Sequence, residues 1–251
     1  MSPVVGKGQK AKRPTAKVIR PTPTAAVAAA PVAGPVSTDR LNRELVTLHG
    51  RRSADEGVDA SGLFAHYQRL VELEVLIGAR ESAVLDLIEN DLPAYGTYVV
   101  LRAGVGELAL LIAASGRKVV ASEPNHRRRR AIEAGQAHLE GLGLIPAGAV
   151  TIVEAVIPQE LVQGAALGVG LNVAYGFDDD AASTLIDSLS AVENLLIDPR
   201  LFLRVRDPAD QERLALDLER NGFDRRQDYP GKALALFSRS ANSAEVSART
   251  A

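Results

Sequence analysis

Apolar side chains first recur at helical spacing near Thr38, and Gly50 then stands as a stop signal. Between these two positions the pattern is carried by Leu41, Leu45 and Leu48. The spacing resumes further along the chain at Leu63, Tyr67, Leu70, Val71, Leu73, Ile77, Val84, Leu85 and Ile88. Because apolar positions three or four apart line one face of a helix, residues 63–88 predict one long helix or two helices joined near Gly78.

After Pro93 the pattern changes to short apolar runs that alternate with helical segments. The runs that predict buried strands cover residues 97–101, 118–122, 150–153, 171–174 and 201–205. The segments that predict helices cover residues 107–115, 125–140, 180–196 and 207–221. Two last runs, 223–228 and 233–238, flank the turn signal Tyr229-Pro-Gly-Lys232 and predict a closing hairpin. The expected fold is therefore α/β, a doubly wound and mainly parallel seven-stranded sheet with a C-terminal antiparallel hairpin.

The glycine-containing turn after the first predicted strand carries the clearest chemical signal. Gly104 and Gly106 lie in the sequence Leu-Arg-Ala-Gly-Val-Gly-Glu, between a strand and a helix, and Glu123 follows the second strand. Glycine lets a ligand approach the backbone closely, and a helix N-terminus offers free N–H groups. A carboxylate at the neighbouring strand end accepts hydrogen bonds from both ribose hydroxyls. In sheets of this kind, ligands bind at the carboxyl ends of the strands.

Two families share this arrangement. Gly104-x-Gly106-x-x-Ala109 with Glu123 fits the dinucleotide fingerprint of NAD-dependent oxidoreductases. The segment resembles class I S-adenosylmethionine-dependent methyltransferases more closely. With Gly106 aligned to the last glycine of their motif, the later motif positions follow without a gap at Leu108, Ala109, Ala113, Gly116, Val119 and Glu123. The tripeptide Glu123-Pro124-Asn125 is similar to that of the FkbM-type members.

This resemblance implies S-adenosylmethionine as the cofactor. It implies that Gly104 and Gly106 admit the cofactor, that Glu123 binds its ribose, and that Glu154 lies near the adenine. The acceptor would be a hydroxyl group of a small molecule or a sugar. No catalytic residue is identified, because Asp178, Asp179 and Asp180 have the position of a helix cap and its first turn.

The motif also departs from the family pattern. Val100 stands where the family has an acid that helps to hold the amino-acid end of the cofactor, and Arg102 replaces the first glycine. Arg102 would either pair with the cofactor's carboxylate or fill the pocket. A second hypothesis follows, in which the fold is catalytically degenerate and serves as a scaffold or binding subunit. An NAD-dependent oxidoreductase is the third hypothesis.

Composition divides the chain into four parts. Residues 1–37 form a basic Pro/Ala-rich arm that is expected to be disordered, residues 38–61 a helical lead-in, residues 62–240 the methyltransferase-like domain, and residues 241–251 a disordered tail. The arm has six cations and no acid, while the rest of the chain is net negative. We expect the arm to bind a protein partner or an anionic surface. Nucleic acid is less favoured, because aromatic residues for base stacking are few.

The absence of Cys excludes disulfides and thiolate metal sites, and it fits a reducing compartment such as the cytoplasm. The four histidines show no metal-binding spacing, and no apolar run is long enough for a transmembrane segment. The four arginines at 127–130 are interpreted as a solvated helix face, with an anion contact as the alternative.

Overall fold

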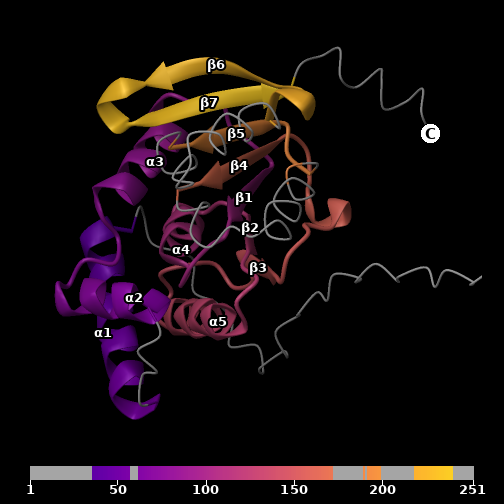
Figure 1. Cartoon of the computed structure of the whole chain (residues 1–251). Helices are drawn as coiled ribbons and strands as arrows, with labels where there is room; N and C mark the ends of the chain where they lie inside the picture. The colour runs from indigo at the N-terminus through magenta and orange to yellow at the C-terminus, as the bar shows by residue number, and fades with distance from the viewer. Residues whose placement is uncertain (1–35, 57–61, 172–188, 190, 199–217, 240–251) are drawn as a thin grey trace, which may run out of the picture.

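A computed structural model describes residues 36–56, 62–171, 189, 191–198 and 218–239. Its centre is a seven-stranded sheet in the order β3-β2-β1-β4-β5-β7-β6 (Figure 1). The strands are β1 (Thr97–Leu101), β2 (Val119–Ser122), β3 (Val150–Val153), β4 (Ala166–Gly170), β5 (Asn194–Ile197), β6 (Phe223–Tyr229) and β7 (Leu234–Arg239). The first five pair in parallel, and β7 is antiparallel to both β5 and β6. This is the predicted doubly wound α/β sheet with its C-terminal hairpin.

Strand β1 lies inside the sheet and is buried on both of its faces. Alternate side chains of a strand point to opposite faces, so β1 contributes to two cores. Tyr98 and Val100 pack into the larger core, which also holds the apolar side chains of α4, whereas Val99 and Leu101 pack into the second core with β5 and the hairpin. The continuous apolar run of β1 follows from this double burial.

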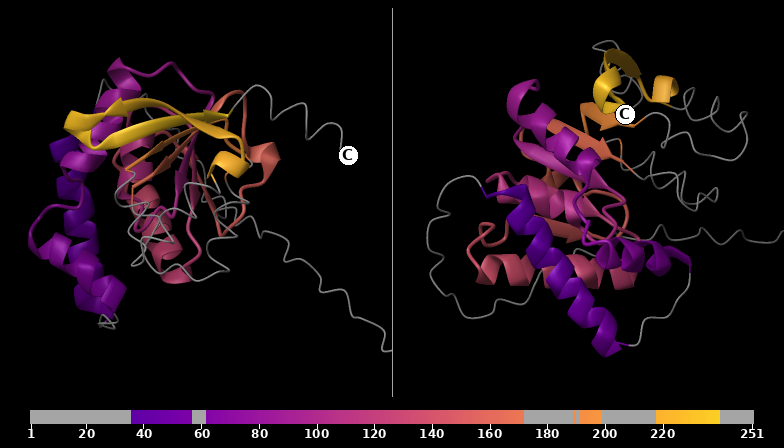
Figure 2. Two further views of the ribbon diagram at one scale, coloured as in Figure 1. Left: turned by 45° about the horizontal axis from the view of Figure 1, so that its top comes forward. Right: turned by 90° about the vertical axis from the view of Figure 1, so that its left-hand side faces the viewer.

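The helices are α1 (Thr38–Glu56), α2 (Gly62–Glu72), α3 (Ala79–Asn90), α4 (Glu107–Ala114) and α5 (His126–Gly141), with short 3-10 turns η1 (Gln159–Leu161) and η2 (Pro230–Lys232). Helix α1 packs against α2, α4 and α5, and Figure 2 shows it beside the layer formed by α5. Its buried contacts come from Leu41 and Leu45. Among the described helices, none has the length and apolarity needed to span a membrane.

Two expectations about the first helices are resolved by the structure. Gly50 does not end α1, which continues to Glu56. A glycine inside a helix is tolerated at a modest cost, so it is a weaker stop than tertiary packing. Residues 63–88 form two helices, and the chain between them turns at Glu74, whose φ is 55°. The second of these, α3, begins after Gly78, whose backbone N–H donates to the Glu81 carboxylate at 2.9 Å.

The fourth and fifth strands differ from their predicted positions. Strand β4 ends at Gly170, before the predicted 171–174 segment, and β5 occupies residues that were assigned to the end of the 180–196 helix. Strand β4 contains two glycines, which a propensity argument disfavours. Gly168 fits there because a Cβ would lie 3.1 Å from Leu195 of β5, which leaves little room for a side chain. The predicted strand 201–205 and residues 172–174 lie outside the described residues, as does almost all of the predicted helix 207–221.

Candidate functional site

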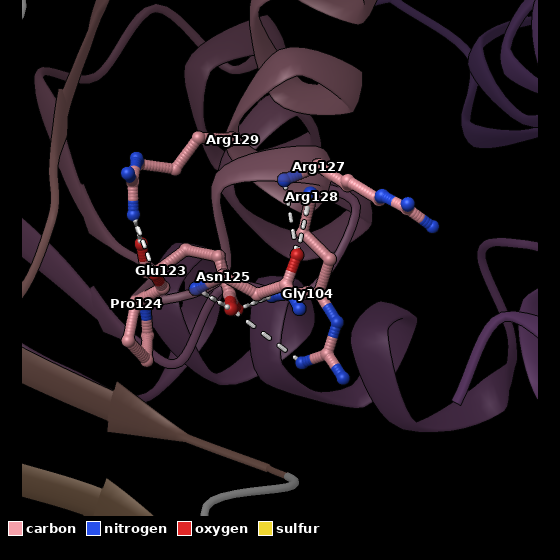
Figure 3. Close-up of polar contacts among 7 residues, drawn as sticks. All are labelled: Gly104, Glu123, Pro124, Asn125, Arg127, Arg128 and Arg129. Atoms are coloured by element: carbon pink, nitrogen blue, oxygen red, sulfur yellow. Dashed lines mark hydrogen bonds and ion pairs between the residues drawn. The ribbon is translucent and has the colours of Figure 1, made fainter. Parts of the chain in front are cut away.

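The ends of β1 and β2 bring the glycine turn and the predicted acid together. The two strands pair in parallel up to Leu101 and Ser122, so the residues that follow each strand emerge at the same edge of the sheet. The Glu123 carboxylate is 1% exposed, and its Oε2 accepts a hydrogen bond from the Gly104 N–H at 2.9 Å (Figure 3). Its Oε1 accepts one from the Asn125 N–H at 3.0 Å. The carboxylate thus holds the two loops against each other.

Helix α5 starts beside this carboxylate and brings two arginines inward. Asn125 caps the helix, because its Oδ1 accepts from the N–H groups of Arg127 and Arg128 at 3.0 and 3.3 Å (Figure 3). The Arg128 guanidinium lies 3.5 Å from Glu123 Oε1 and 5.9 Å from the centre of the Tyr67 ring. Arg128 therefore stands between the acid and α2, and it covers the carboxylate.

Arg129 is buried and contacts the loop after β2 and the end of β3. Its guanidinium donates to the backbone carbonyls of Glu123 and Pro124 at 2.9 and 2.6 Å, and it lies 3.4 Å from the Glu154 carboxylate. The prediction that the arginine run is a solvated face is therefore wrong for two of its four members. The sequence could not show this, because the inward pair is defined by the packing of α5 on the loop after β2.

Backbone conformation in the glycine turn explains part of its sequence. Gly104 and Gly106 have φ values of 63° and 96°, in the left-handed region that favours glycine. A Cβ on Gly106 would lie 3.0 Å from Ile132, so this glycine also lets α4 and α5 approach each other. Arg102, at the first glycine position of the motif, has a φ of 49°. A non-glycine residue pays roughly 1 kcal/mol for that conformation, so the backbone still has the form that a glycine would take.

Tyr67 on α2 lies directly over Gly104. A Cβ added to Gly104 would come within 2.2 Å of the tyrosine hydroxyl, which shows how closely that hydroxyl approaches the turn. Burial, and secondarily the charge of Glu107, raises the pKa of Tyr67 well above its usual value. From the sequence, Tyr67 was interpreted only as an apolar helix position. No local signal revealed its place, because the contact depends on how α2 packs.

Glu107, the first residue of α4, was also missed. It is 8% exposed, and its Oε2 has no hydrogen-bond partner among the residues that the structure describes. Burial raises the pKa of Glu107 to about 8, and the nearby Glu81 and Glu123 add to the effect. An acid in the first turn of a helix is usually explained by the helix dipole. The available signal was its position, directly after Gly106.

The predicted site residues are therefore brought together to different degrees. Gly104 and Glu123 are joined by a hydrogen bond, and Glu154, whose side chain is 47% exposed, is connected to them through Arg129. Val100 is buried in the apolar core, so the position of the family's acid is occupied by a side chain that cannot bind a charge. The segment 175–180, with its three aspartates, lies outside the described residues.

The arrangement suits a ligand with hydroxyl groups and a positive charge. Backbone at Gly104, the N-terminus of α4 and the Glu123 carboxylate lie at one strand edge, where doubly wound sheets bind nucleotides. The hydroxyl groups of a diol could donate hydrogen bonds to Glu123 in place of the Gly104 and Asn125 N–H groups and Arg128. The buried carboxyl group of Glu107 adds a second acid beside the same glycine.

No protein-family model matches the chain, and no curated protein sequence matches it. Solved structures with a similar fold include a TehB-like S-adenosylmethionine-dependent methyltransferase from Corynebacterium glutamicum, with 14% identity over 70% of this chain and 95% of that chain and a TM-score of 0.45. The magnesium protoporphyrin IX methyltransferase from Synechocystis, solved with bound S-adenosylmethionine, has 15% identity over 82% and 98% of the two chains and a TM-score of 0.45. The glycopeptide N-methyltransferase MtfA has 16% identity over 66% and 92%, with a TM-score of 0.45. By its own strand order and the antiparallel direction of β7, the chain has the class I methyltransferase fold.

Proposed function

We propose that this chain is an S-adenosylmethionine-dependent methyltransferase whose nucleoside site lies at the carboxyl ends of β1 and β2. The observation that carries the proposal is the 2.9 Å hydrogen bond between the Gly104 N–H and Glu123 Oε2. It supports a site in which bare backbone and a ribose-binding carboxylate face the same ligand. Gly106 would support the turn from behind, and Glu154 would line the adenine end.

The chemistry asks little of the protein beyond positioning. If bound, the cofactor would supply a methyl group from its sulfonium to an acceptor hydroxyl, and the proton of that hydroxyl would pass to solvent. Holding the acceptor in line with the sulfonium accounts for much of the rate, so an identified general base is not required. An acceptor hydroxyl on a small molecule or sugar is the finer proposal, and it follows from the likeness of Glu123-Pro124-Asn125 to the FkbM-type enzymes.

Ligand entry requires a local rearrangement. The Tyr67 hydroxyl lies against Gly104, and Arg128 lies between the Tyr67 ring and the Glu123 carboxylate. A ribose that reaches Glu123 has to displace both side chains. The two belong to different helices, α2 and α5, so a small shift of α2 together with a new Arg128 rotamer is the simplest opening.

A second candidate is favoured by Tyr67 and by the two departures from the family motif. Tyr67 over Gly104, Val100 in place of an acid and Arg102 in place of a glycine all fit a catalytically degenerate fold. Such a protein would act as a scaffold or binding subunit, tethered through its basic arm at residues 1–37 to a protein partner or an anionic surface. Deletion of the arm should then abolish partner binding at an unchanged melting temperature, and retained binding would reject the tether.

Calorimetric titration with S-adenosylmethionine and S-adenosylhomocysteine separates the two candidates. The methyltransferase proposal predicts saturable binding by the wild type, which is lost in Glu123→Ala and kept in the control Glu160→Ala, an exposed acid on η1. A blocked site predicts no binding by the wild type and binding by Arg102→Gly or Tyr67→Ala. If none of these proteins binds either nucleoside, the methyltransferase proposal is rejected.

A further inference from the structure

Glu107 is a buried acid that forms no ion pair with any residue that the structure describes. Its Oε1 lies on the side of Gly104 where a side chain would point, 3.3 Å from the position of an added Cβ. Its Oε2 has no hydrogen-bond partner within the described part of the chain. A buried carboxyl group in this state is costly unless a ligand satisfies it, so it marks a place where a polar partner is missing.

Four groups from different parts of the fold surround Glu107, and two of them are carboxylates. Glu81 on α3 and Glu123 after β2 act on it with negative charge, and Tyr67 on α2 is coupled to it. Arg128 on α5 is the nearby cation, and it pairs with Glu123. The balance leaves negative potential at Glu107, which favours a positively charged ligand group over an anionic one.

We propose that the Glu107 carboxylate binds the ammonium group of the amino-acid end of S-adenosylmethionine, and that it supplies the acid that the chain lacks at Val100. This inference rests on the proposed function. Gly104 lies between the two acids, with Glu123 hydrogen-bonded to its N–H and Glu107 beside its Cα. A ligand across the glycine therefore places its ribose on Glu123 and its amino-acid end on Glu107.

This assignment explains how the chain could bind the cofactor without an acid at Val100. Val100 points into the core shared with α4, and Glu107 begins α4 at the opposite end of the same turn. Moving the acid from the strand to the first turn of the helix keeps a carboxylate next to the glycine backbone. The backbone N–H groups of Glu107 and Val105 also stabilise the ionised carboxylate of Glu107, and a bound cation would neutralise its charge.

Binding should then be linked to a proton. With a pKa raised to about 8, Glu107 is mostly protonated at neutral pH in the free protein, and an ammonium group stabilises the ionised form. Close to one proton should be released for each ligand bound at pH 7. Affinity should therefore rise between about pH 6 and pH 7.5, by as much as about tenfold per pH unit if a single proton is released.

Three ligands test the assignment by calorimetry in buffers of different ionisation enthalpy. S-adenosylmethionine has both the ammonium and the sulfonium, S-adenosylhomocysteine keeps only the ammonium, and 5′-methylthioadenosine has neither. Glu107→Gln should weaken the first two at least tenfold, since a charge-assisted hydrogen bond is lost, and should leave the third within twofold. The proton release should disappear in this variant, while the exposed control Glu160→Gln should behave as wild type. Thermal melting checks that each variant is folded.

Each other outcome overturns the inference in a recognisable way. Equal affinity of wild type and Glu107→Gln for all three ligands removes Glu107 from the site and leaves the proposed function standing. A loss confined to S-adenosylmethionine assigns the carboxylate to the sulfonium instead of the ammonium. An equal loss for all three ligands makes Glu107 a structural support of the nucleoside pocket. No binding of any ligand to the wild type rejects the proposed function and this inference together.

Discussion

The backbone N–H of Gly104 donates to the Glu123 carboxylate at 2.9 Å, across nineteen positions of sequence. This bond joins the turn after β1 to the loop after β2, and the carboxylate that accepts it is buried. The residue that is proposed to bind the ribose therefore also holds the site together in the free protein. A ribose bound at Glu123 would have to replace these contacts with its own hydroxyls, so we expect its affinity to depend on how easily Tyr67 and Arg128 move.

Replacement of Glu123 by Ala should destabilise the fold as well as the site. The change leaves the N–H groups of Gly104 and Asn125 and the Arg128 guanidinium without their carboxylate, and removal of a buried ion-pair partner costs about 3 kcal/mol. Chemical denaturation measures this loss. Glu154→Ala, which removes a half-exposed partner of Arg129, should change the free energy of unfolding by no more than about 1 kcal/mol. Similar losses in both variants would contradict the structural role of Glu123.

Arg102→Gly should be as stable as Arg102→Ala or more stable by up to about 1 kcal/mol. The substitution removes the strain of a left-handed conformation at φ 49°, and the greater freedom of glycine in the unfolded chain offsets part of that gain. Arg102→Ala keeps the strain and is the matched control. The urea midpoints of the two variants measure this difference in stability. An alanine variant that is more stable than the glycine variant would contradict the left-handed backbone conformation at residue 102.

Gly104→Ala should be strongly destabilising in the wild-type background and less so in Tyr67→Phe. The added methyl group would come within 2.2 Å of the tyrosine hydroxyl and would also require an alanine at φ 63°. Phenylalanine removes the clashing oxygen but keeps the ring. A double-mutant cycle of unfolding free energies should therefore give a coupling energy of about 1 kcal/mol or more. Additive effects would mean that the hydroxyl does not lie over Gly104.

Glu107 should make stability fall as pH rises. Its pKa is raised from the ordinary 4.5 to about 8 in the folded protein, so between these values the folded state keeps a proton that the unfolded state has lost. The contribution is fully present below about pH 4.5, declines by up to about 1.4 kcal/mol per pH unit, and is lost above about pH 8. Glu107→Gln does not titrate, so its stability relative to wild type should grow over this range. A difference independent of pH would show that Glu107 is ionised throughout.

The predictable part of the fold depended on clear changes of hydrophobic period. The strands at 97–101 and 150–153, the helix 126–141 and the closing hairpin were recognisable because apolar runs and helical faces alternate there. Strand β4 was not, because its two glycines lower strand propensity, and the close approach of Leu195 on β5 to Gly168 is visible only in the folded structure. Strand β5 is a short buried run that follows a helical pattern, and period alone does not separate the two.

The candidate site was predicted as far as topology determines it. Adjacent parallel strands bring their carboxyl ends together, so the meeting of Gly104 with Glu123 followed from the motif spacing. Tyr67, Glu107 and Arg128 were not predicted as site residues. The positions of Tyr67 and Arg128 depend on how α2 and α5 pack over the turn, and such contacts between distant helices leave no local pattern in the sequence. Glu107 had a local signal, its position directly after Gly106, but an acid in the first turn of a helix is usually explained by the helix dipole.

The most direct measurement is a crystal structure with S-adenosylhomocysteine. We expect that both ribose hydroxyls lie within hydrogen-bond distance of Glu123, that the adenine lies toward Glu154, and that the Tyr67 hydroxyl has left Gly104. A complex in which Tyr67 still covers Gly104 and the nucleoside lies away from Glu123 would contradict it.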